Sequence, residues 1–238
     1  MSDPQLSIII PVLNESAIIE GKLASLQVLR PWAEIIVVDG GSHDSTPELA
    51  KPWVDHLVIS SPGRARQMNN GAALATSPYL LFLHVDTRLP CDLKNLERAM
   101  QEQVVWGRFD VVILGKHPML KVIAKMMNVR SRVTGIATGD QAIFVKRTAF
   151  AMAQGFPDQP LMEDIEFSKR LKALQNPRCI RELVETSGRR WEKKGVLRTI
   201  SLMWFLRLAY WIGCSPKSLA VLYGYRVDEE GDSECRRL

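Results

Sequence analysis

Four short apolar runs, separated by segments with a helical pattern, constrain the fold of this chain more than any other feature. The runs are Leu6–Ile10, Glu34–Val38, Leu57–Ile59 and Tyr79–Leu83. Short apolar runs bounded by turn residues are typical of buried strands. Strands that alternate with helices predict a parallel sheet with helices on both faces.

The alternation weakens after residue 86. Residues 92–102 have a helical pattern, residues 104–114 and 141–145 look extended, and a further helix is expected to begin at Met162. No stretch rich in proline, glycine or serine divides the chain, and no internal repeat is visible. We therefore predict a single domain over residues 1–225, followed by a polar, disordered tail over residues 226–238.

The charge and the cysteines narrow the class of protein. The formal net charge of +5 is compatible with a nucleotide, a membrane surface or a nucleic acid as partner. No nucleic-acid-binding module is recognisable, so nucleic acid is set aside. The cysteines Cys91, Cys179, Cys214 and Cys235 lack the spacing of a metal site and are expected to be reduced thiols. The sequence has no signal-peptide pattern and no run of ~20 apolar residues that could span a membrane. These features predict a cytoplasmic protein.

Polar side chains follow the first two predicted strands. Pro11, Asn14 and Glu15 come after the first, and Asp39, with two glycines behind it, ends the second. Ligands of open α/β sheets bind beyond the carboxyl ends of the strands, where Asp39 could accept hydrogen bonds from a base or ribose. A simple turn closed by local hydrogen bonds is the alternative for Asp39. Asn14 could cap the following helix, and Glu15 could stabilise its first turn.

The fourth run leads to His84 and Asp86. A carboxylate and an imidazole two residues apart suit a divalent cation on a diphosphate. On the preceding helix, Arg66 and Asn70 lie four residues apart and share one face. Arginine matches phosphate geometry, although a solvated basic face would explain the same residues.

Three later motifs are also candidates. Glu163 and Asp164 begin a helix, where acids are stabilised by the helix dipole and where a carboxylate can also act as a general base. Asp140 could contact a sugar hydroxyl or simply form a turn. Arg190 and Trp191 could grip a diphosphate or stack on a ring, with a surface loop as the alternative.

The segment from Trp191 to Gly213 is apolar on nearly all sides but contains Arg198 and Arg207. A core helix, a contact between subunits and an amphipathic helix on a membrane surface all fit this pattern. The sequence favours core or dimer packing and leaves the membrane contact open.

These motifs together resemble the GT-A glycosyltransferases of family 2. The resemblance is carried by residues 7–15, SIIIPVLNE, and 37–46, VVDGGSHDST, followed at the expected distances by Asp86 and Glu163–Asp164. Residues 64–72, RARQMNNGA, and 84–87, HVDT, further resemble a small bacterial subgroup with diaponeurosporenoate-type glycosyltransferases among its members. The resemblance implies a GT-A, Rossmann-like fold: a mostly parallel central sheet, helices on both faces and a C-terminal helical segment.

The resemblance also implies roles for the donor-binding residues. Pro11, Glu15 and Asp39 would hold the base and ribose, and Arg66 would meet the base or phosphates. Asp86 would bind Mg²⁺ or Mn²⁺ on the diphosphate. His84 replaces the usual first acid of the family's D-x-D motif; imidazole ligates Mn²⁺ but is a poor Mg²⁺ ligand, so the identity of the metal stays open.

The remaining roles concern catalysis and the acceptor. Asp164 would be the general base of an inverting displacement, with Glu163 in support. Arg190 and Trp191 would replace the family's later R-W element near the diphosphate and acceptor. The nucleotide-binding half would span about residues 1–90, the acceptor half about 91–195 and the apolar C-terminal helices about 191–225.

The sequence thus predicts an inverting, hexosyltransferase-like enzyme that uses a UDP- or GDP-type sugar donor. The acceptor group would be a hydroxyl or carboxyl, and the apolar C-terminal segment hints at a lipid-like acceptor. Homodimerisation and peripheral contact with the inner face of the cell membrane remain open. The alternatives are a non-catalytic sugar-nucleotide-binding or scaffold protein, and a nucleotidyltransferase. The second usually has a glycine-rich basic loop after its first strand, which residues 11–15 lack.

Overall fold

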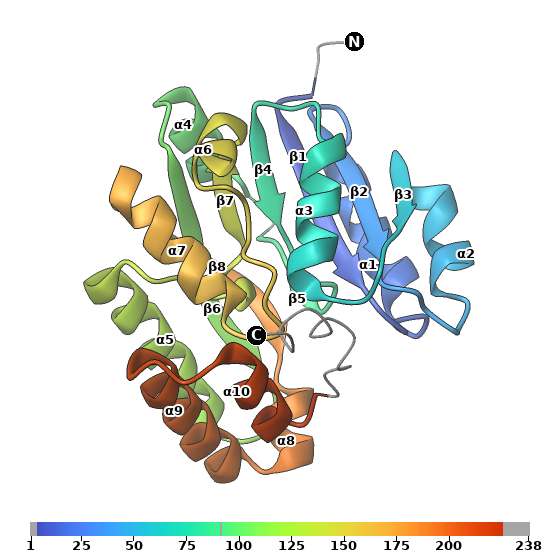
Figure 1. Ribbon diagram of the computed structural model, residues 1–238. Coiled ribbons are helices and arrows are strands. Elements are labelled where there is room, and N and C mark those ends of the chain that lie inside the picture. The colour runs from blue at the N-terminus through green and yellow to red at the C-terminus, as the bar shows by residue number, and fades with distance from the viewer. Residues whose placement is uncertain (1–3, 91, 226–238) are drawn as a thin grey trace, which may run out of the picture.

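An eight-stranded sheet organises the computed structural model, which describes residues 4–90 and 92–225 (Figure 1). The strands are β1 (Leu6–Val12), β2 (Ala33–Asp39), β3 (His56–Ile59), β4 (Tyr79–Phe82), β5 (Thr87–Arg88), β6 (Trp106–Leu114), β7 (Ile143–Lys146) and β8 (Arg178–Ser187). Their order is β3-β2-β1-β4-β7-β6-β8-β5. The tail predicted at residues 226–238 lies outside the described residues.

Helices fill the connections. The α-helices are α1 (Ile19–Leu26), α2 (Thr46–Ala50), α3 (Arg64–Leu74), α4 (Lys94–Gln101), α5 (Met119–Thr134), α6 (Arg147–Met152), α7 (Glu163–Leu174), α8 (Arg189–Lys194), α9 (Val196–Trp211) and α10 (Pro216–Tyr223). Single 3₁₀ turns are η1 (Gln27–Leu29), η2 (Lys51–Trp53) and η3 (Gly139–Gln141).

The sheet is mostly parallel, as predicted. β1 pairs in parallel with both β2 and β4, and β2 pairs in parallel with β3. β7 reverses direction between β4 and β6, and the short β5 runs antiparallel to β8. β6 and β8 are again parallel. The four strands predicted from the apolar runs therefore form one parallel half of the sheet.

Two cores cover the two faces of the sheet. Side chains alternate along β1, so Ile8 and Ile10 pack with α1, α2 and α4, whereas Ile9 packs with α3, α6 and α7. The approach of α3 is close at Gly71, where an added Cβ would lie 2.5 Å from Ile9 Cγ2 and 3.0 Å from Val38 Cγ2. This packing confirms helices on both faces and holds α3 close against β1 and β2.

The C-terminal helices pack against the beginning of α7. Leu206 and Ala209 of α9 and Leu219 of α10 form a buried cluster with Met162 and Ile165. Figure 1 shows α5, α8, α9 and α10 gathered at one end of the molecule, away from β3. One face of the predicted apolar helix is therefore core, and its opposite face remains exposed. Within the described part of the chain, no helix combines the length and the apolar character needed to cross a membrane.

The structure differs from prediction at several local points. Asn14 does not cap the first helix, because α1 begins at Ile19 and Asn14 has a left-handed backbone, with φ 54°. Strands β5 and β8 and helices α5 and α6 were not predicted. β8 was missed because its arginines and glutamates interrupt the apolar pattern of its buried positions.

Candidate active site

Asp39 closes the turn that follows β2. Its Oδ2 accepts hydrogen bonds from the backbone N–H groups of Gly41 (2.9 Å) and Ser42 (2.7 Å), and its Oδ1 accepts one from Ser42 Oγ. The side chain is almost fully buried. The contacts are those of the turn that the sequence offered as an alternative; binding of a base or ribose stays a prediction.

Asn14 and Glu15 belong to the loop after β1 and join it to the loop after β2. The N–H of Asn14 donates to Ser42 Oγ (2.8 Å), Asn14 Oδ1 accepts the N–H of His43 (2.9 Å), and the N–H of Glu15 donates to Thr46 Oγ1 (2.8 Å). The two loops therefore form one preorganised rim. Pro11 lies within β1, in register with Val38 of β2.

A buried glutamine that sequence reasoning missed sets the spacing of this rim. Gln67 of α3 donates from Nε2 to the carbonyls of Val12 and Val38, each at 2.8 Å. It thereby ties α3 to the ends of β1 and β2. A glutamine in a polar helix start gives no sequence signal for burial.

The predicted pair on α3 has separate partners. Arg66 is exposed and its Nε lies 2.9 Å from both carboxylate oxygens of Asp158, whereas Asn70 donates to Ser60 Oγ at the end of β3 (2.9 Å). Of the two arginines at this helix start, Arg64 rather than Arg66 faces the predicted catalytic acids, with Nη1 3.7 Å from Glu163 Oε1.

A second cluster joins β4, η3 and α7. His84 Nδ1 lies 3.2 Å from Asp140 Oδ1, and Asp164 Oδ2 accepts the N–H of Gly139 at 3.1 Å. The His84 ring packs so closely on Gly139 that an added Cβ would overlap it. The structure thus brings His84, Asp140, Glu163 and Asp164 to one place, although they are separated by up to 80 residues in the sequence.

The two acids that begin α7 are strongly affected by their surroundings. Burial raises the pKa of Glu163, and the adjacent Asp164 raises it further, while Arg64 opposes the shift. Burial also raises the pKa of Asp164, against hydrogen bonds from the N–H groups of Gly139 and Ile165. A carboxylate with raised proton affinity, fixed by two backbone donors, is suited to accept a proton.

Arg130 of α5 is a further residue that sequence reasoning missed. Its Nε and Nη2 are buried and have no hydrogen-bonding partner among the described residues. Burial lowers the pKa of Arg130, and Asp164 opposes that shift, so the guanidinium lies within electrostatic range of the predicted base. Because α5 was not predicted, Arg130 could not be placed here from the sequence alone.

Asp86 and His84 have different neighbours. They belong to one turn, in which the N–H of Thr87 donates to the carbonyl of His84 (3.0 Å). Asp86 lies within electrostatic range of Lys22 of α1, a buried lysine whose Nζ donates to the carbonyl of Thr87. Burial lowers the pKa of Lys22 to about 7, and Asp86 partly offsets that effect.

The residues around Asp86 fit one mode of metal binding. Among the described residues, no group of three His, Cys, Asp or Glu side chains could hold a metal ion alone. A single carboxylate still suits Mg²⁺ or Mn²⁺ when diphosphate oxygens and water complete the coordination. Nδ1 of the His84 ring is paired with Asp140, and Nε2 is buried against Gly139. The ring would therefore have to move before either nitrogen could reach a metal. His84 as a metal ligand therefore stays a prediction that requires movement of the ring.

The predicted Arg-Trp element lies in α8. Trp191 is half-buried and packs against the cluster of Ile113, Leu120 and Val196. The Arg190 side chain lies outside the described part of the structure. Contact of either residue with a diphosphate stays a prediction.

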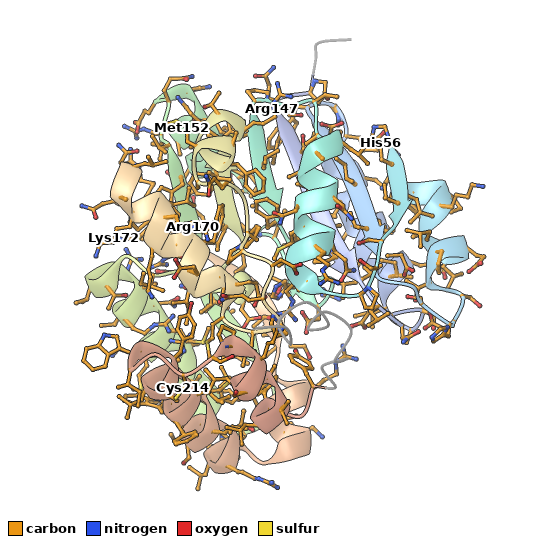
Figure 2. The ribbon with its side chains drawn as sticks, in the orientation of Figure 1. His56, Arg147, Met152, Arg170, Lys172 and Cys214 are labelled. Atoms are coloured by element: carbon orange, nitrogen blue, oxygen red, sulfur yellow. The ribbon has the colours of Figure 1, made fainter. Side chains whose placement is uncertain are left out.

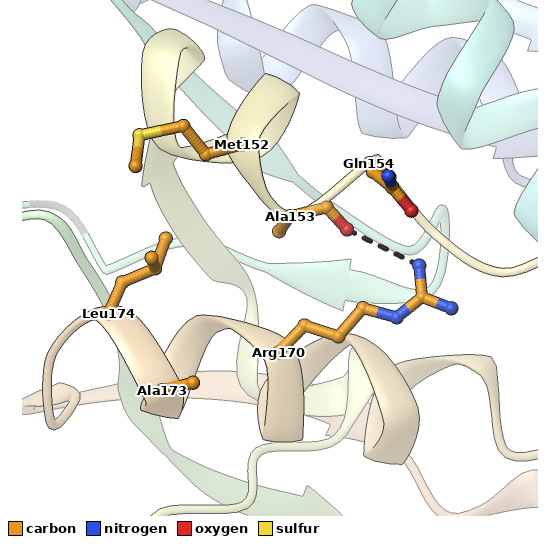
Figure 3. A pocket seen from close by; sticks show the side chains of 6 residues that line it. All are labelled: Met152, Ala153, Gln154, Arg170, Ala173 and Leu174. Atoms are coloured by element: carbon orange, nitrogen blue, oxygen red, sulfur yellow. Dashed lines mark hydrogen bonds between the residues drawn. The ribbon is translucent and has the colours of Figure 1, made fainter.

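The cavity between α6 and α7 has a different character (Figure 3). It measures about 430 Å³ and is lined by Met152, Ala153, Gln154, Arg170, Ala173 and Leu174. Arg170 Nη1 donates to the carbonyl of Ala153 at 3.3 Å, and the lining residues include no aspartate, glutamate, histidine or cysteine. This hollow does not include the acids described above.

Comparison with protein families identifies the chain. A model described as glycosyl transferase family 2 matches residues 7–154, more than half of its length. The chain belongs to this family. The matched part contains the Asp39 turn, the turn of His84 and Asp86, and η3, which carries Asp140.

Curated relatives match over a shorter segment. A PGL/p-HBAD biosynthesis glycosyltransferase of Mycobacterium bovis is 38% identical over 98 residues, which cover 37% of this chain and 38% of that protein. A validoxylamine A glucosyltransferase of Streptomyces hygroscopicus is 33% identical over 90 residues, which cover 34% of this chain and 21% of that protein. This family 2 chain therefore matches well under half the length of either relative.

Solved structures share the fold over a larger part of the chain. The mannosyltransferase PcManGT from Pyrobaculum calidifontis, in complex with GDP-Man and Mn²⁺, has a TM-score of 0.58 at 21% identity. The matched region covers 77% of this chain and 57% of the PcManGT chain. Residues 1–349 of S. aureus TarS, in complex with UDP-GlcNAc, have a TM-score of 0.62 at 16% identity, with 77% of this chain and 58% of that TarS fragment covered. At these identities the likeness establishes the GT-A fold alone.

Proposed function

We propose that this family 2 glycosyltransferase transfers a hexose, with inversion, from a nucleotide-diphospho-sugar to a hydroxyl or carboxyl group of its acceptor. The observation that carries the proposal is the placement of Asp164. Two backbone N–H groups fix its carboxylate, burial raises its pKa, and Arg64 and Arg130 lie nearby. This arrangement suits a base that faces a developing anionic leaving group.

The donor would bind at the joined loops after β1 and β2. Pro11, Asn14, Glu15 and Asp39 would hold the base and ribose there, with Arg66 and Asn70 beside them. A UDP or GDP donor is favoured because solved relatives of this fold hold GDP-Man or UDP-GlcNAc. Residues 1–225 would form the whole catalytic domain, with the donor half ending near residue 90.

The diphosphate would be held by cations. Mg²⁺ or Mn²⁺ bound to Asp86 would neutralise charge on the leaving nucleotide. Arg64, which lies beside Glu163, would contribute a fixed positive charge near the reacting carbon, and Asp140 would contact the sugar. Glu163 would support the base, while Arg190 and Trp191 would border the acceptor.

The acceptor is proposed to be lipid-like, as in the diaponeurosporenoate-type subgroup that the sequence resembles. Hydroxyl and carboxyl acceptors differ in what they require of Asp164. A hydroxyl must lose its proton as it attacks, whereas a carboxylate is already ionised at neutral pH. Loss of the Asp164 carboxylate should therefore slow transfer to a hydroxyl by about 10²–10⁴-fold and slow transfer to a carboxylate much less.

The first test is calorimetric titration with UDP and GDP, each in Mn²⁺, Mg²⁺ or chelator. The proposal expects one nucleotide to bind in the micromolar range with metal, and expects Asp86→Ala to lose the metal dependence. Asp92→Ala, an exposed acid outside the site, is the matched control. Nucleotide affinity that is the same with metal and with chelator would contradict a metal site at Asp86. The arginines alone would then hold the diphosphate.

A non-catalytic sugar-nucleotide-binding protein of the same fold is the second candidate. It is favoured by the paired state of His84 and by the lysine beside Asp86, both of which work against tight metal binding. Nucleotide binding without hydrolysis or transfer of the sugar, on soluble and lipid acceptors alike, would support this candidate.

A further inference from the structure

The outer face of α9 exposes a row of large apolar side chains. Its members are Leu197, Trp204, Phe205, Leu208, Trp211 and Ile212. At 100° per residue these positions share one side of the helix. Trp204 is 64% and Trp211 79% exposed, and α10 adds the exposed Val221 and Leu222. We call these eight residues the outer face; a cluster of exposed large apolar side chains of this kind marks an interaction site.

The charged side chains of α9 and α10 all have one sign. Residues 196–225 contain Arg198, Arg207 and Lys217 but no aspartate or glutamate. Arg198 and Arg207 fall on opposite sides of the apolar row. The adjoining α5 exposes Lys121 and Lys125 and also lacks acids. Basic side chains that flank an apolar row can reach anionic groups while the row itself leaves water.

A depression at the start of α9 extends this positive border. It measures about 660 Å³ and is lined by Lys116, His117, Pro118, Glu192, Gly195, Val196, Leu197 and Arg198. The carboxylate of Glu192 already accepts the N–H groups of Lys116 (2.5 Å) and His117 (3.3 Å). The depression therefore offers the side chains of Lys116 and Arg198 to an anion beside the apolar Leu197.

We infer that the outer face binds the surface of a lipid bilayer that carries anionic headgroups. Exposed tryptophans suit the boundary between headgroups and acyl chains. With 16 residues, α9 is about 24 Å long, shorter than the ~30 Å of a bilayer's apolar core, so it lies in the plane of the surface. A second copy of the chain is a poorer partner, because a symmetric contact between α9 and α10 would bring the same cations together, and neither helix contains an acid to face them.

The inner face of α9 links this surface to the candidate active site. Leu206 and Ala209 pack on Met162 and Ile165, the residues that flank Glu163 and Asp164. Packed helices lie about 8–10 Å apart, so the bilayer surface is one helix layer from the proposed base. Access to a lipid-anchored acceptor rests on the proposed function; binding to the bilayer does not.

Co-sedimentation of the full chain with vesicles tests the inference. We expect binding to phosphatidylcholine vesicles that contain phosphatidylglycerol, weaker binding to pure phosphatidylcholine, and weakening by salt. Leu208→Glu should reduce binding at least tenfold. Val28→Glu is the matched control, because Val28 is also an exposed apolar residue but lies in η1 of the donor half. Figure 2 shows Cys214, which follows α9, at the end of the molecule opposite Arg147, so a polarity-sensitive dye on Cys214 should report the contact.

Three outcomes would overturn the inference. Wild-type protein that stays in solution with anionic vesicles excludes the bilayer. Equal binding of Leu208→Glu and wild type to anionic vesicles would show that the contact lies on another surface. Dimers in sedimentation velocity that Leu208→Glu dissociates, without vesicle binding, would assign the face to a second copy. Nucleotide titration of the same variants separates these results from failure of the proposed function, since the outward substitutions leave the donor site intact. Deleting residues from Val196 onward is unsuitable, because it would also remove the support of α7.

Discussion

The loops of the donor half and the cluster at the start of α7 differ in how far the polar side chains are satisfied by hydrogen bonds. In the donor half, the carboxylates of Asp39 and Asp44 are each satisfied by hydrogen bonds from neighbouring loop residues. At α7, Glu163 and Asp164 are crowded acids with raised pKa, and Arg130 keeps buried donors without partners among the described residues. The first region is organised before a ligand arrives. The second holds charge whose cost the fold alone does not offset, which is typical of a reacting site.

The largest expected effect follows from Asp164→Asn. If Asp164 is the base for a hydroxyl acceptor, the turnover rate should fall by about 10²–10⁴-fold while nucleotide affinity is unchanged. Because burial raises the pKa of Asp164, its ionised form is disfavoured in the fold, and the asparagine variant should be at least as stable at pH 7. Single-turnover kinetics and urea unfolding measure the two effects. A slower and less stable variant would mean that Asp164 is structural.

Asp39→Ala should have the next largest effect. Unlike Asp164→Asn, it should lower the stability of the fold. It removes the acceptor of two backbone N–H groups and one hydroxyl, so unfolding free energy should fall by about 1–3 kcal/mol. Urea unfolding with and without nucleotide measures it. Asp158→Ala removes an exposed carboxylate and serves as the control. Lost nucleotide binding at unchanged stability would contradict a structural role for the turn.

Lys22→Met tests a buried charge between the two regions. Folded Lys22 has a pKa near 7 against its ordinary 10.5, so between these values the unfolded chain holds more protons and stability should rise with pH. Methionine should flatten this slope and raise the unfolding free energy by about 1–3 kcal/mol at pH 6, with little change at pH 10. Thermal melts over this pH range provide the measurement. Parallel pH curves for the two proteins would show that Lys22 is not penalised by burial.

Arg66→Ala should have the smallest effect on stability. The pair with Asp158 is exposed on both sides and should contribute less than about 1 kcal/mol. If Arg66 meets the diphosphate, the same variant should weaken nucleotide binding tenfold or more, and Arg170→Ala, far from the donor loops, should not. Calorimetry at two salt concentrations distinguishes a phosphate contact from a surface pair.

The two regions also differ in how far the sequence predicts them. The strands of the donor half are continuous apolar runs, so β1 to β4 were found, and Asp39 was correctly placed at a strand end. In the second half, β8 has both buried and exposed positions and was missed, and no helix was predicted over the residues of α5. Arg130 and Lys22 are buried because other elements pack over them. The local sequence around a polar residue in a helix does not indicate such burial. The roles of the site residues stay predictions until they are tested.

The contact of Gly71 with Ile9 and Val38 limits how donor preference can be engineered. With no room for even a methyl group, α3 cannot slide along the sheet without opening the core, and Gln67 on the same helix keeps the two loop ends at a fixed separation. Libraries that vary core positions behind the loops would yield mainly unfolded protein. If the base binds at these loops, productive variation would have to come from exposed loop tips such as His43, where a new side chain leaves the frame beneath it in place.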